Sequence, residues 1–164
     1  MDWQARVADV WARADELGAT GVVEAIDALA AERPADDALA LAERGGARDS
    51  AGLESEAEPF YRAALAAGLP EDQREQVTIQ LASTIRNLGR AEESLELLRA
   101  EFADRPDSPY AAAATAFAAL ALASLGRPTE GLVAVLHALA PTLPRYQRSV
   151  RGYADELLDD LPVD

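Results

Sequence analysis

Apolar residues recur along this chain at helical spacing, in segments that glycine and proline interrupt. In "RNLGRAEESLELLRAEFADRP" (86–106) the spacing breaks at Gly89, restarts at once and stops at Pro106. The same break occurs in "DSAGLESEAEPFYRAALAAGLP" (49–70) and in "ASLGRPTEGLVAVLHALAPTLP" (123–144). Apolar residues three and four positions apart share one face of a helix, and glycine commonly ends a helix. The pattern therefore predicts pairs of helices joined by short glycine turns.

The three turn glycines are evenly spaced, and the residues around them are equivalent. Gly52, Gly89 and Gly126 are 37 residues apart. Each has a small residue seven positions before it and another five positions after it, a large apolar residue nine positions after it, and a closing proline: Gly45, Ala82 and Ala119; Ala57, Ser94 and Gly131; Tyr61, Leu98 and Val135; Pro70, Pro106 and Pro144. Small residues let two helices approach closely, so each unit predicts an antiparallel hairpin. Hairpins repeated at a fixed period stack into a solenoid, because one hairpin cannot bury its own apolar face.

This pattern of small residues, glycine turn and closing proline resembles the tetratricopeptide repeat. The resemblance is clearest in residues 75–106 and also covers 38–70 and 112–144. The early tryptophan of the motif is replaced by Leu41, Thr78 and Thr115, and a usual packing alanine is Glu101. The resemblance implies one domain over residues 1–164, an all-α, right-handed α-solenoid of antiparallel helical hairpins with a C-terminal capping helix.

Both ends of the chain are expected to complete the solenoid. Residues 1–34 are interpreted as a degenerate N-terminal hairpin that breaks at Leu17-Gly18, with its second helix in 20–34. Residues 145–161 are interpreted as the capping helix, because a solenoid needs an atypical end to cover its last apolar face. The side chains expected to face inward from this cap are Tyr146, Val150, Tyr153, Leu157 and Leu158.

Over nearly its full length, the chain is also similar to a family of small bacterial tetratricopeptide-repeat proteins. The segments that carry this likeness are "RDSAGLESEAEPFYRAALAAGLP" (48–70), "QLASTIRNLG" (80–89) and "LPRYQRSVRGYADEL" (143–157). The resemblance implies protein interaction as the role, together with self-association. It brings no catalytic residues to this chain.

Composition narrows the classes of partner. The chain has 164 residues, 29 of them acidic and 15 basic, for a formal net charge of −14. This charge disfavours binding to nucleic acid and to anionic membranes. There is no cysteine, which excludes disulfides and thiolate metal sites. The first residues carry charges throughout and lack an apolar signal core, so we expect a cytoplasmic protein.

One uncharged run needs a separate interpretation. Residues 108–126, "SPYAAAATAFAALALASLG", contain no charged side chain. A membrane-spanning helix needs about 20 apolar residues, but alanine dominates this run and it lies within the repeat pattern. The run therefore favours a buried helix over a membrane span.

Candidate chemistry is sparse, so we expect no enzyme, no metal site and no cofactor. His137 is the only histidine, and with no second histidine and no cysteine it is interpreted as a packed or half-exposed helix residue. The acidic clusters at 36–37, 92–93 and 155–160 lack the alternating spacing and the glycine of a calcium loop. They are interpreted as solvated helix faces and an acidic tail.

Three candidate binding surfaces follow, two from the repeat register and one from the arginines that recur along the capping helix. The first helix of each hairpin lines the groove of such solenoids, which predicts a partner-binding groove at Gln76, Ile79, Ser83, Arg86 and Asn87. There Arg86 and Asn87 could clamp a peptide carbonyl or carboxylate, or Arg86 could form an internal ion pair. A self-association surface is predicted at Ala113, Ala116, Leu120 and Ala123. A basic stripe at Arg145, Arg148 and Arg151 could bind an anion, or pair internally with Asp155 and Glu156.

The sequence therefore predicts a non-enzymatic interaction module that binds protein or peptide and forms a homodimer. A first alternative is a purely structural homodimer without a peptide ligand. A second is a helical domain that senses a small molecule or regulates an enzyme, which an apolar cavity bounded by arginine would support. An enzyme dependent on His137 is the least favoured interpretation.

Overall fold

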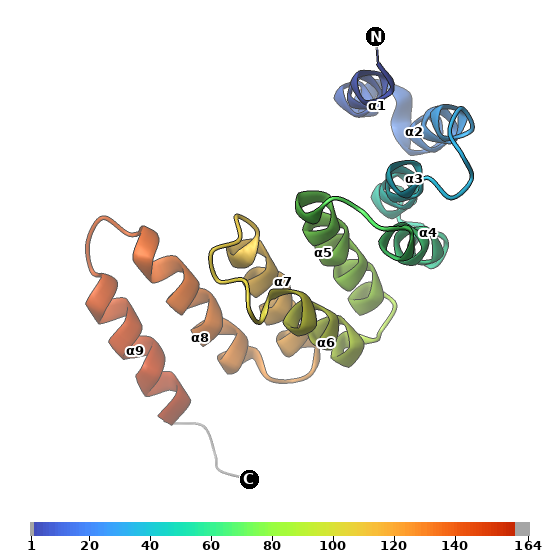
Figure 1. Cartoon of the computed structure of the whole chain (residues 1–164). Coiled ribbons are helices and arrows are strands. Elements are labelled where there is room, and N and C mark those ends of the chain that lie inside the picture. Colours follow the sequence, from blue (N-terminus) through green and yellow to red (C-terminus); the bar gives the residue numbers. More distant parts are fainter. Residues whose placement is uncertain (1, 160–164) are drawn as a thin grey trace. The chain divides into compact units, whose positions relative to one another are not determined.

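The computed structural model describes residues 2–159, and over this range it contains nine α-helices and no strand (Figure 1). A short 3-10 helix, η1 (Ala140–Thr142), precedes the last of them. The nine helices are α1 (Trp3–Ala12), α2 (Ala14–Ala30), α3 (Ala38–Ser50), α4 (Glu54–Ala67), α5 (Glu71–Asn87), α6 (Ala91–Phe102), α7 (Ala111–Ser124), α8 (Pro128–Leu139) and α9 (Gln147–Asp159). The chain divides into two compact units, Met1–Thr84 and Ile85–Asp164, and the division falls within α5.

The three predicted glycine turns are all present and share one hydrogen-bond pattern. Gly52, Gly89 and Gly126 have φ of 72°, 83° and 78°, the left-handed region that a glycine enters without steric cost. In each turn the next residue donates its backbone N–H to a carbonyl five positions earlier: Leu53 to Arg48 at 2.9 Å, Arg90 to Ile85 at 3.1 Å and Arg127 to Leu122 at 2.9 Å. This bond satisfies a carbonyl at the end of the first helix, and it explains why the chain can reverse within so few residues.

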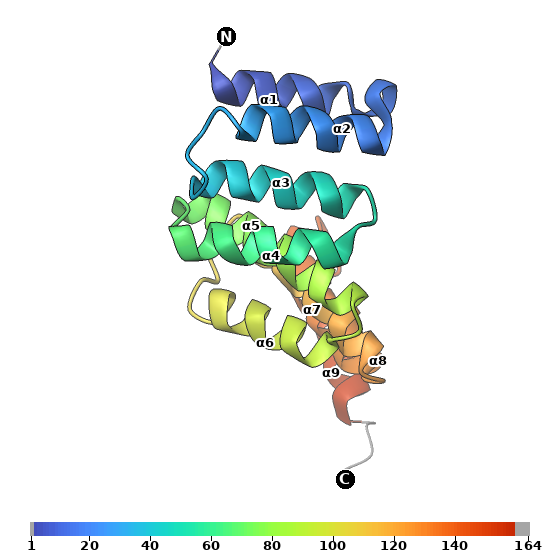
Figure 2. The same ribbon diagram turned by 90° about the vertical axis from the view of Figure 1, so that its right-hand side faces the viewer.

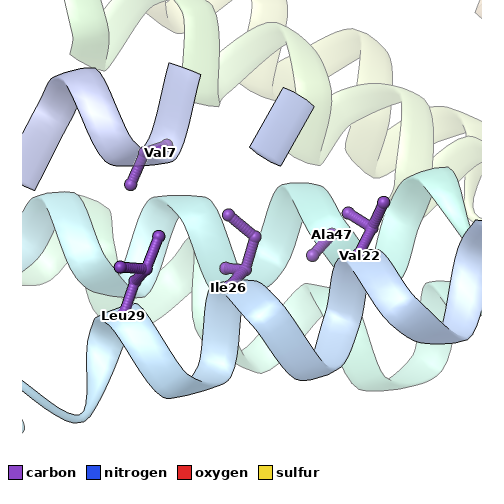
Figure 3. Close-up of a cluster of buried hydrophobic side chains, with 5 residues drawn as sticks. All are labelled: Val7, Val22, Ile26, Leu29 and Ala47. Atoms are coloured by element: carbon purple, nitrogen blue, oxygen red, sulfur yellow. The ribbon is translucent and has the colours of Figure 1, made fainter. Parts of the chain in front are cut away.

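In the first unit, α1 to α4 follow one another as neighbouring helices (Figure 2). Asp2 and Asp37 begin α1 and α3, where their carboxylates accept the backbone N–H groups of Ala5 at 2.7 Å and Ala40 at 2.9 Å. The apolar sides of α1, α2 and α3 meet in one buried cluster, formed by Val7, Val22, Ile26, Leu29 and Ala47 (Figure 3). Burial of this cluster holds the N-terminal helices together.

The hairpin of α3 and α4 depends on a glycine beneath an aromatic ring. The Tyr61 side chain is fully buried, and a Cβ added at Gly45 would lie only 2.6 Å from its ring. Gly45 is the small residue seven positions before the turn, and Tyr61 is the large residue nine positions after it. These two positions, which are equivalent in every repeat, therefore lie in contact between α3 and α4.

In the second unit, α7 packs against both α6 and α8, and α8 packs against α9. Leu95 of α6 and Ala121 and Leu122 of α7 form a buried cluster between the first two. In the hairpin of α7 and α8 the close contact involves backbone rather than a side chain, because a Cβ added at Gly131 would lie 2.8 Å from the backbone oxygen of Ala119. Here the two small residues that the register predicted, one before and one after the turn, meet each other.

The N-terminal hairpin differs in detail from its prediction. The predicted break at Gly18 is present: its backbone is non-helical, with φ of 67° and ψ of 169°, and it separates two helical segments that α2 joins across a kink. The helix after the kink ends at Ala30, whereas the sequence suggested that it extends to Pro34. At the other end, residues 160 and 161 of the predicted cap lie outside the described residues.

Candidate functional site

The predicted self-association surface on α7 is largely exposed. Ala116, Leu120 and Ala123 are exposed, with Leu120 47% accessible, and Ala113 is half-buried. The residues of α7 that pack against α6 lie on its other side, among them Ala121 and Leu122. The helix is therefore only partly covered within the second unit.

The close contact of Ala119 with Gly131 brings the exposed side of α7 next to an exposed side of α8. When two antiparallel helices touch at one residue each, the next residue along each helix turns by about 100° to the same side of the pair. Leu120 and Leu132 are those next residues, and they are 47% and 49% exposed. The two leucines therefore lie side by side on one face of the hairpin.

The contact of α8 with α9 extends this face. His137 of α8 and Asp155 of α9 approach within 2.9 Å, from Nε2 to Oδ1. A residue two positions away on a helix points about 200° around the axis, so Leu139 and Tyr153 lie on the opposite side of the two helices from this pair. They are 45% and 67% exposed.

These four side chains define one surface. Leu132 and Leu139 are seven residues apart, which places them on the same side of α8. Leu120, Leu132, Leu139 and Tyr153 therefore form an exposed surface across α7, α8 and α9, which we call the apolar face. Sequence reasoning identified its α7 portion and missed the rest, although the spacing of Leu132 and Leu139 was readable.

The capping helix buries different residues from those predicted. Tyr146, Tyr153 and Leu158 were expected to face inward, but they are 73%, 67% and 42% exposed. The fully buried residue is Ala154. Only Val150 and Leu157, one turn on either side of Ala154, agree in part with the prediction, being half-buried.

The basic stripe is exposed and has no internal partner within residues 2–159. Arg145, Arg148 and Arg151 are all exposed, and none forms an ion pair with another described residue. The carboxylate of Asp155, which sequence reasoning offered as their partner, lies instead against His137. His137 is therefore a half-exposed helix residue, as the sequence suggested, and it also pairs with a carboxylate of the neighbouring helix, which the sequence did not suggest.

The predicted groove on α5 is only partly available. Ile79 was expected to be exposed, but it is 6% accessible and belongs to the core. Gln76 is exposed and Ser83 is half-buried. Arg86 donates through Nη2 to Oδ1 of Asn87 at 2.9 Å, so these two side chains bind each other rather than lying open as a clamp. The alternative of an internal ion pair for Arg86 is likewise not seen among the described residues.

A polar cluster in the first unit escaped sequence reasoning. Trp11 donates its indole N–H to Glu43 at 2.7 Å, and Asp49 accepts hydrogen bonds from Thr84 at 3.0 Å and from Tyr61 at 3.4 Å. Burial raises the pKa of both carboxyl groups, and the hydrogen bonds oppose that rise only in part. Burial, followed by the charge of Asp49, also raises the pKa of Tyr61. Both carboxyl groups already have hydrogen-bond donors, so the cluster stabilises the packing of the helices.

A second network in this unit involves arginine. The carboxylate of Asp27 on α2 forms ion pairs with Arg44 and with Arg48, each at 2.8 Å. The guanidinium groups of both arginines also lie over the ring of Phe60. Hydrogen bonds from Arg48 chiefly lower the pKa of Asp27, against the effect of burial. The register placed Arg48 where the other repeats carry Ile85 and Leu122, and this network explains how a charge occupies a core position.

No group of three or more metal-binding side chains lies within the described residues. None of the described helices is long and apolar enough to cross a membrane.

Comparison with known proteins agrees with this architecture. A family model described as Tetratrico peptide repeat matches residues 38–157. Two crystal structures of nearly identical TPR-like repeats, from a Podosopora anserina protein described as a kinesin light chain, are similar to the chain. Each has a TM-score of 0.68 and 19% sequence identity, covering 95% of this chain and 91% of that chain. At this identity the likeness shows the fold alone, and it confirms the predicted all-α solenoid. No curated protein matches the chain.

Proposed function

The chain belongs to the tetratricopeptide-repeat family, and from that premise we propose that it is a non-enzymatic module that binds other proteins, its apolar face binding a second copy of the chain. The observation that carries this proposal is the exposure of Leu120, Leu132, Leu139 and Tyr153 on neighbouring helices. A monomeric protein rarely leaves large apolar side chains of several elements open to water on one side.

The charge distribution favours a second copy as the occupant. Two chains that each carry a net charge of −14 repel one another over most of their surface. Helix α7, residues 111–124, contains no charged side chain and consists mostly of alanine. It therefore offers a long surface on which two copies can approach closely without bringing like charges together. A symmetric dimer, in which the same surface is used twice, is the simplest such assembly.

Peptide binding at α5 is a separate part of the proposal. Gln76 and Asn87 are exposed on this helix, and Arg86 is half-buried beside Asn87. If the protein is instead a structural homodimer without a peptide ligand, Arg86→Ala will leave its function untouched, whereas a charge at Leu120 will not.

The experiment that tests self-association is light scattering coupled to gel filtration over a dilution series. We expect a dimer for the unmodified chain and a monomer for Leu120→Glu, because the glutamate would have to lose its water of hydration in the interface. Leu53→Glu is the matched control: Leu53 is 39% exposed but lies in the first unit, outside the apolar face. This control should remain a dimer.

Two results would overturn the proposed dimer. One is a monomeric mass for the unmodified chain at every concentration, and the other is an unchanged dimer for Leu120→Glu. Far-ultraviolet circular dichroism of each variant verifies that a loss of mass does not reflect unfolding.

A further inference from the structure

The arginines of the basic stripe differ from the other arginines of the chain. Every other arginine has at least one hydrogen bond, ion pair or electrostatic interaction with another side chain or with the backbone. Arg145, Arg148 and Arg151 are exposed, and none of them pairs with any of residues 2–159. In a chain with 29 acidic and 15 basic residues, three neighbouring positive charges without a carboxylate are an exception.

The sequence around the basic stripe contains very little negative charge. Residues 108–154 include a single acidic residue, Glu130, and both of its carboxylate oxygens accept hydrogen bonds from Arg127 at 2.6 Å. Asp155 follows the stripe by one helical turn, but its carboxylate approaches His137 at 2.9 Å. The positive charge of the stripe is therefore not compensated by the acidic residues nearest to it.

Two of the arginines lie on one side of α9. Arg148 and Arg151 are three residues apart, so their side chains leave the helix about 60° apart around its axis, with about 5–6 Å between the Cβ atoms. Gly152 is four residues after Arg148 and shares that side. A Cβ added at Gly152 would meet nothing within 4 Å. A partner segment can therefore lie flat against α9 beside both guanidinium groups.

The segment before α9 is held in place and presents an aromatic ring. Gln147 donates its side-chain N–H groups to the carbonyl oxygens of Leu143 at 2.8 Å and Pro141 at 3.3 Å, which fixes the connection to the first residue of the helix. Tyr146 has a φ of 68°, which a bulky residue rarely adopts, and its side chain is 73% exposed. Tyrosine and arginine are enriched where proteins bind one another. An exposed tyrosine next to the stripe is therefore typical of a protein-binding surface.

We propose that the basic stripe, together with Tyr146, binds a short acidic segment of a partner protein, whose carboxylates pair with Arg148 and Arg151. Two carboxylates one turn apart on a partner helix have the same spacing as the two arginines. Each guanidinium group can bind both oxygens of one carboxylate. This surface shares no residue with the groove on α5.

The charge of the rest of the chain limits the partner to a short segment. At physiological salt, exposed charges interact over about 8 Å, so a peptide on the stripe experiences the arginines and little of the net charge of −14. The second half of α9 carries Asp155, Glu156 and Asp159. DNA or an anionic membrane, whose charges form a continuous array, would also meet these carboxylates. The arrangement therefore favours a short acidic protein segment over either of them.

The basic stripe and the apolar face use opposite sides of α9. Arg151 and Tyr153 are two residues apart, which is about 200° around the helix axis. The binding of an acidic segment can therefore be tested, and can fail, independently of self-association. Leu120→Glu, which tests the dimer, changes no arginine and should bind an acidic peptide with nearly unchanged affinity.

The test is a titration of a fluorescently labelled peptide with the full chain, followed by fluorescence anisotropy. The peptide is an alanine-based helix with glutamate at every fourth position, and the matched peptide has glutamine in place of each glutamate. We expect saturable binding of the glutamate peptide at physiological salt and none of the glutamine peptide. Raising NaCl from about 0.15 M to about 0.5 M should weaken the binding, because salt screens exposed charge pairs.

Variants of the chain locate the binding. Arg148→Gln/Arg151→Gln should bind the peptide about tenfold more weakly, because each exposed charge pair contributes less than a tenfold step and two are lost. The matched control, Arg6→Gln/Arg13→Gln, removes the same amount of charge from exposed ion pairs of the first unit and should bind normally. Tyr146→Gly adopts the φ of 68° without strain, so it should keep the fold. It should bind about threefold more weakly, because it lacks the hydroxyl group that donates to a carboxylate.

Peptide binding that Arg148→Gln/Arg151→Gln retains would overturn the proposal, as would equal binding of the glutamate and glutamine peptides. Tighter binding of a single-stranded oligonucleotide of equal charge, or of vesicles that contain phosphatidylserine, would assign the stripe to a different class of partner. A shift of the NMR signals of Arg148 and Arg151 on dilution of the chain alone would show that a second copy occupies the stripe, which also contradicts the proposal.

Discussion

The contact of Gly131 with Ala119 makes a quantitative prediction about stability. A Cβ added at Gly131 would lie 2.8 Å from the backbone oxygen of Ala119 and 3.1 Å from its Cα. Backbone atoms cannot rotate away as the end of a side chain can, so α7 and α8 would have to separate. Overpacking of this kind costs about 1–3 kcal/mol.

The matched control is Gly152→Ala in α9 of the same unit. Gly152 is helical, and a Cβ added there would meet nothing within 4 Å. Glycine in a helix interior costs about 0.5–1 kcal/mol relative to alanine, so this substitution should stabilise the protein by that amount. The same gain applies at Gly131, which means that the difference between the two variants isolates the cost of the close contact.

We therefore expect Gly131→Ala to be about 1–3 kcal/mol less stable than Gly152→Ala. For a chain of this size the gap corresponds to roughly 2–12 °C in Tm. Urea unfolding monitored by circular dichroism measures the free energies, and thermal unfolding measures Tm. If Gly131→Ala stabilises the protein as much as Gly152→Ala does, α7 and α8 are not held at the distance described here.

Three further predictions concern the turns and the two polar networks. Gly126→Ala should lower the free energy of unfolding by about 1–2 kcal/mol, because alanine is strained at a φ of 78° while its Cβ meets nothing within 4 Å; an unchanged urea midpoint would contradict this. Asp27→Asn should cost about 1–3 kcal/mol, because the Arg48 side chain is only 10% exposed and loses its nearest carboxylate. The pKa of Asp27 is lowered in the folded state, so the stability that its carboxylate contributes is present above the unfolded pKa and is lost as the pH falls through the folded pKa. The urea midpoints of the unmodified chain and of Asp27→Asn should therefore converge at acidic pH. Burial raises the pKa of Glu43, so the stability of the protein should fall as the pH rises between the unfolded and folded pKa values of this group. Glu43→Gln keeps an acceptor for the indole N–H of Trp11 and should remove this pH dependence, which urea midpoints measured across the same pH range will test.

The local features of the fold were accessible from the sequence because each depends on a few residues. The turn glycines require a left-handed conformation, and that requirement can be read from one residue type at a fixed period. The pairing of Ala119 with Gly131 follows from the same repeat pattern, because these are the small residues seven positions before and five positions after the turn glycine, and they meet where the two helices touch.

The faces of individual helices were harder to predict. Val77, Thr78 and Ile79 are consecutive and all buried, so α5 is covered over more than half of its circumference rather than along one stripe. The prediction that Ile79 is exposed was wrong because it assumed that each helix has a single continuous exposed side. In the cap, sequence reasoning assumed that the largest side chains face inward, whereas Ala154 is fully buried and the two tyrosines remain outside.

Contacts between residues far apart in the chain cannot be predicted from a single repeat. The polar cluster around Asp49 depends on Thr84, 35 residues away in the chain, and no local pattern connects them.

The backbone contact between Ala119 and Gly131 also has an entropic consequence. Side chains that pack loosely lose conformational freedom when a partner binds, and that loss weakens association. Leu120 and Leu132 follow directly after Ala119 and Gly131. The distance between their helices is set by backbone atoms in contact, which cannot move aside as the end of a side chain can. Their Cα positions are therefore fixed before any partner arrives. The apolar face is preorganised at its centre, and a partner there needs to restrict only the side-chain rotamers of two leucines.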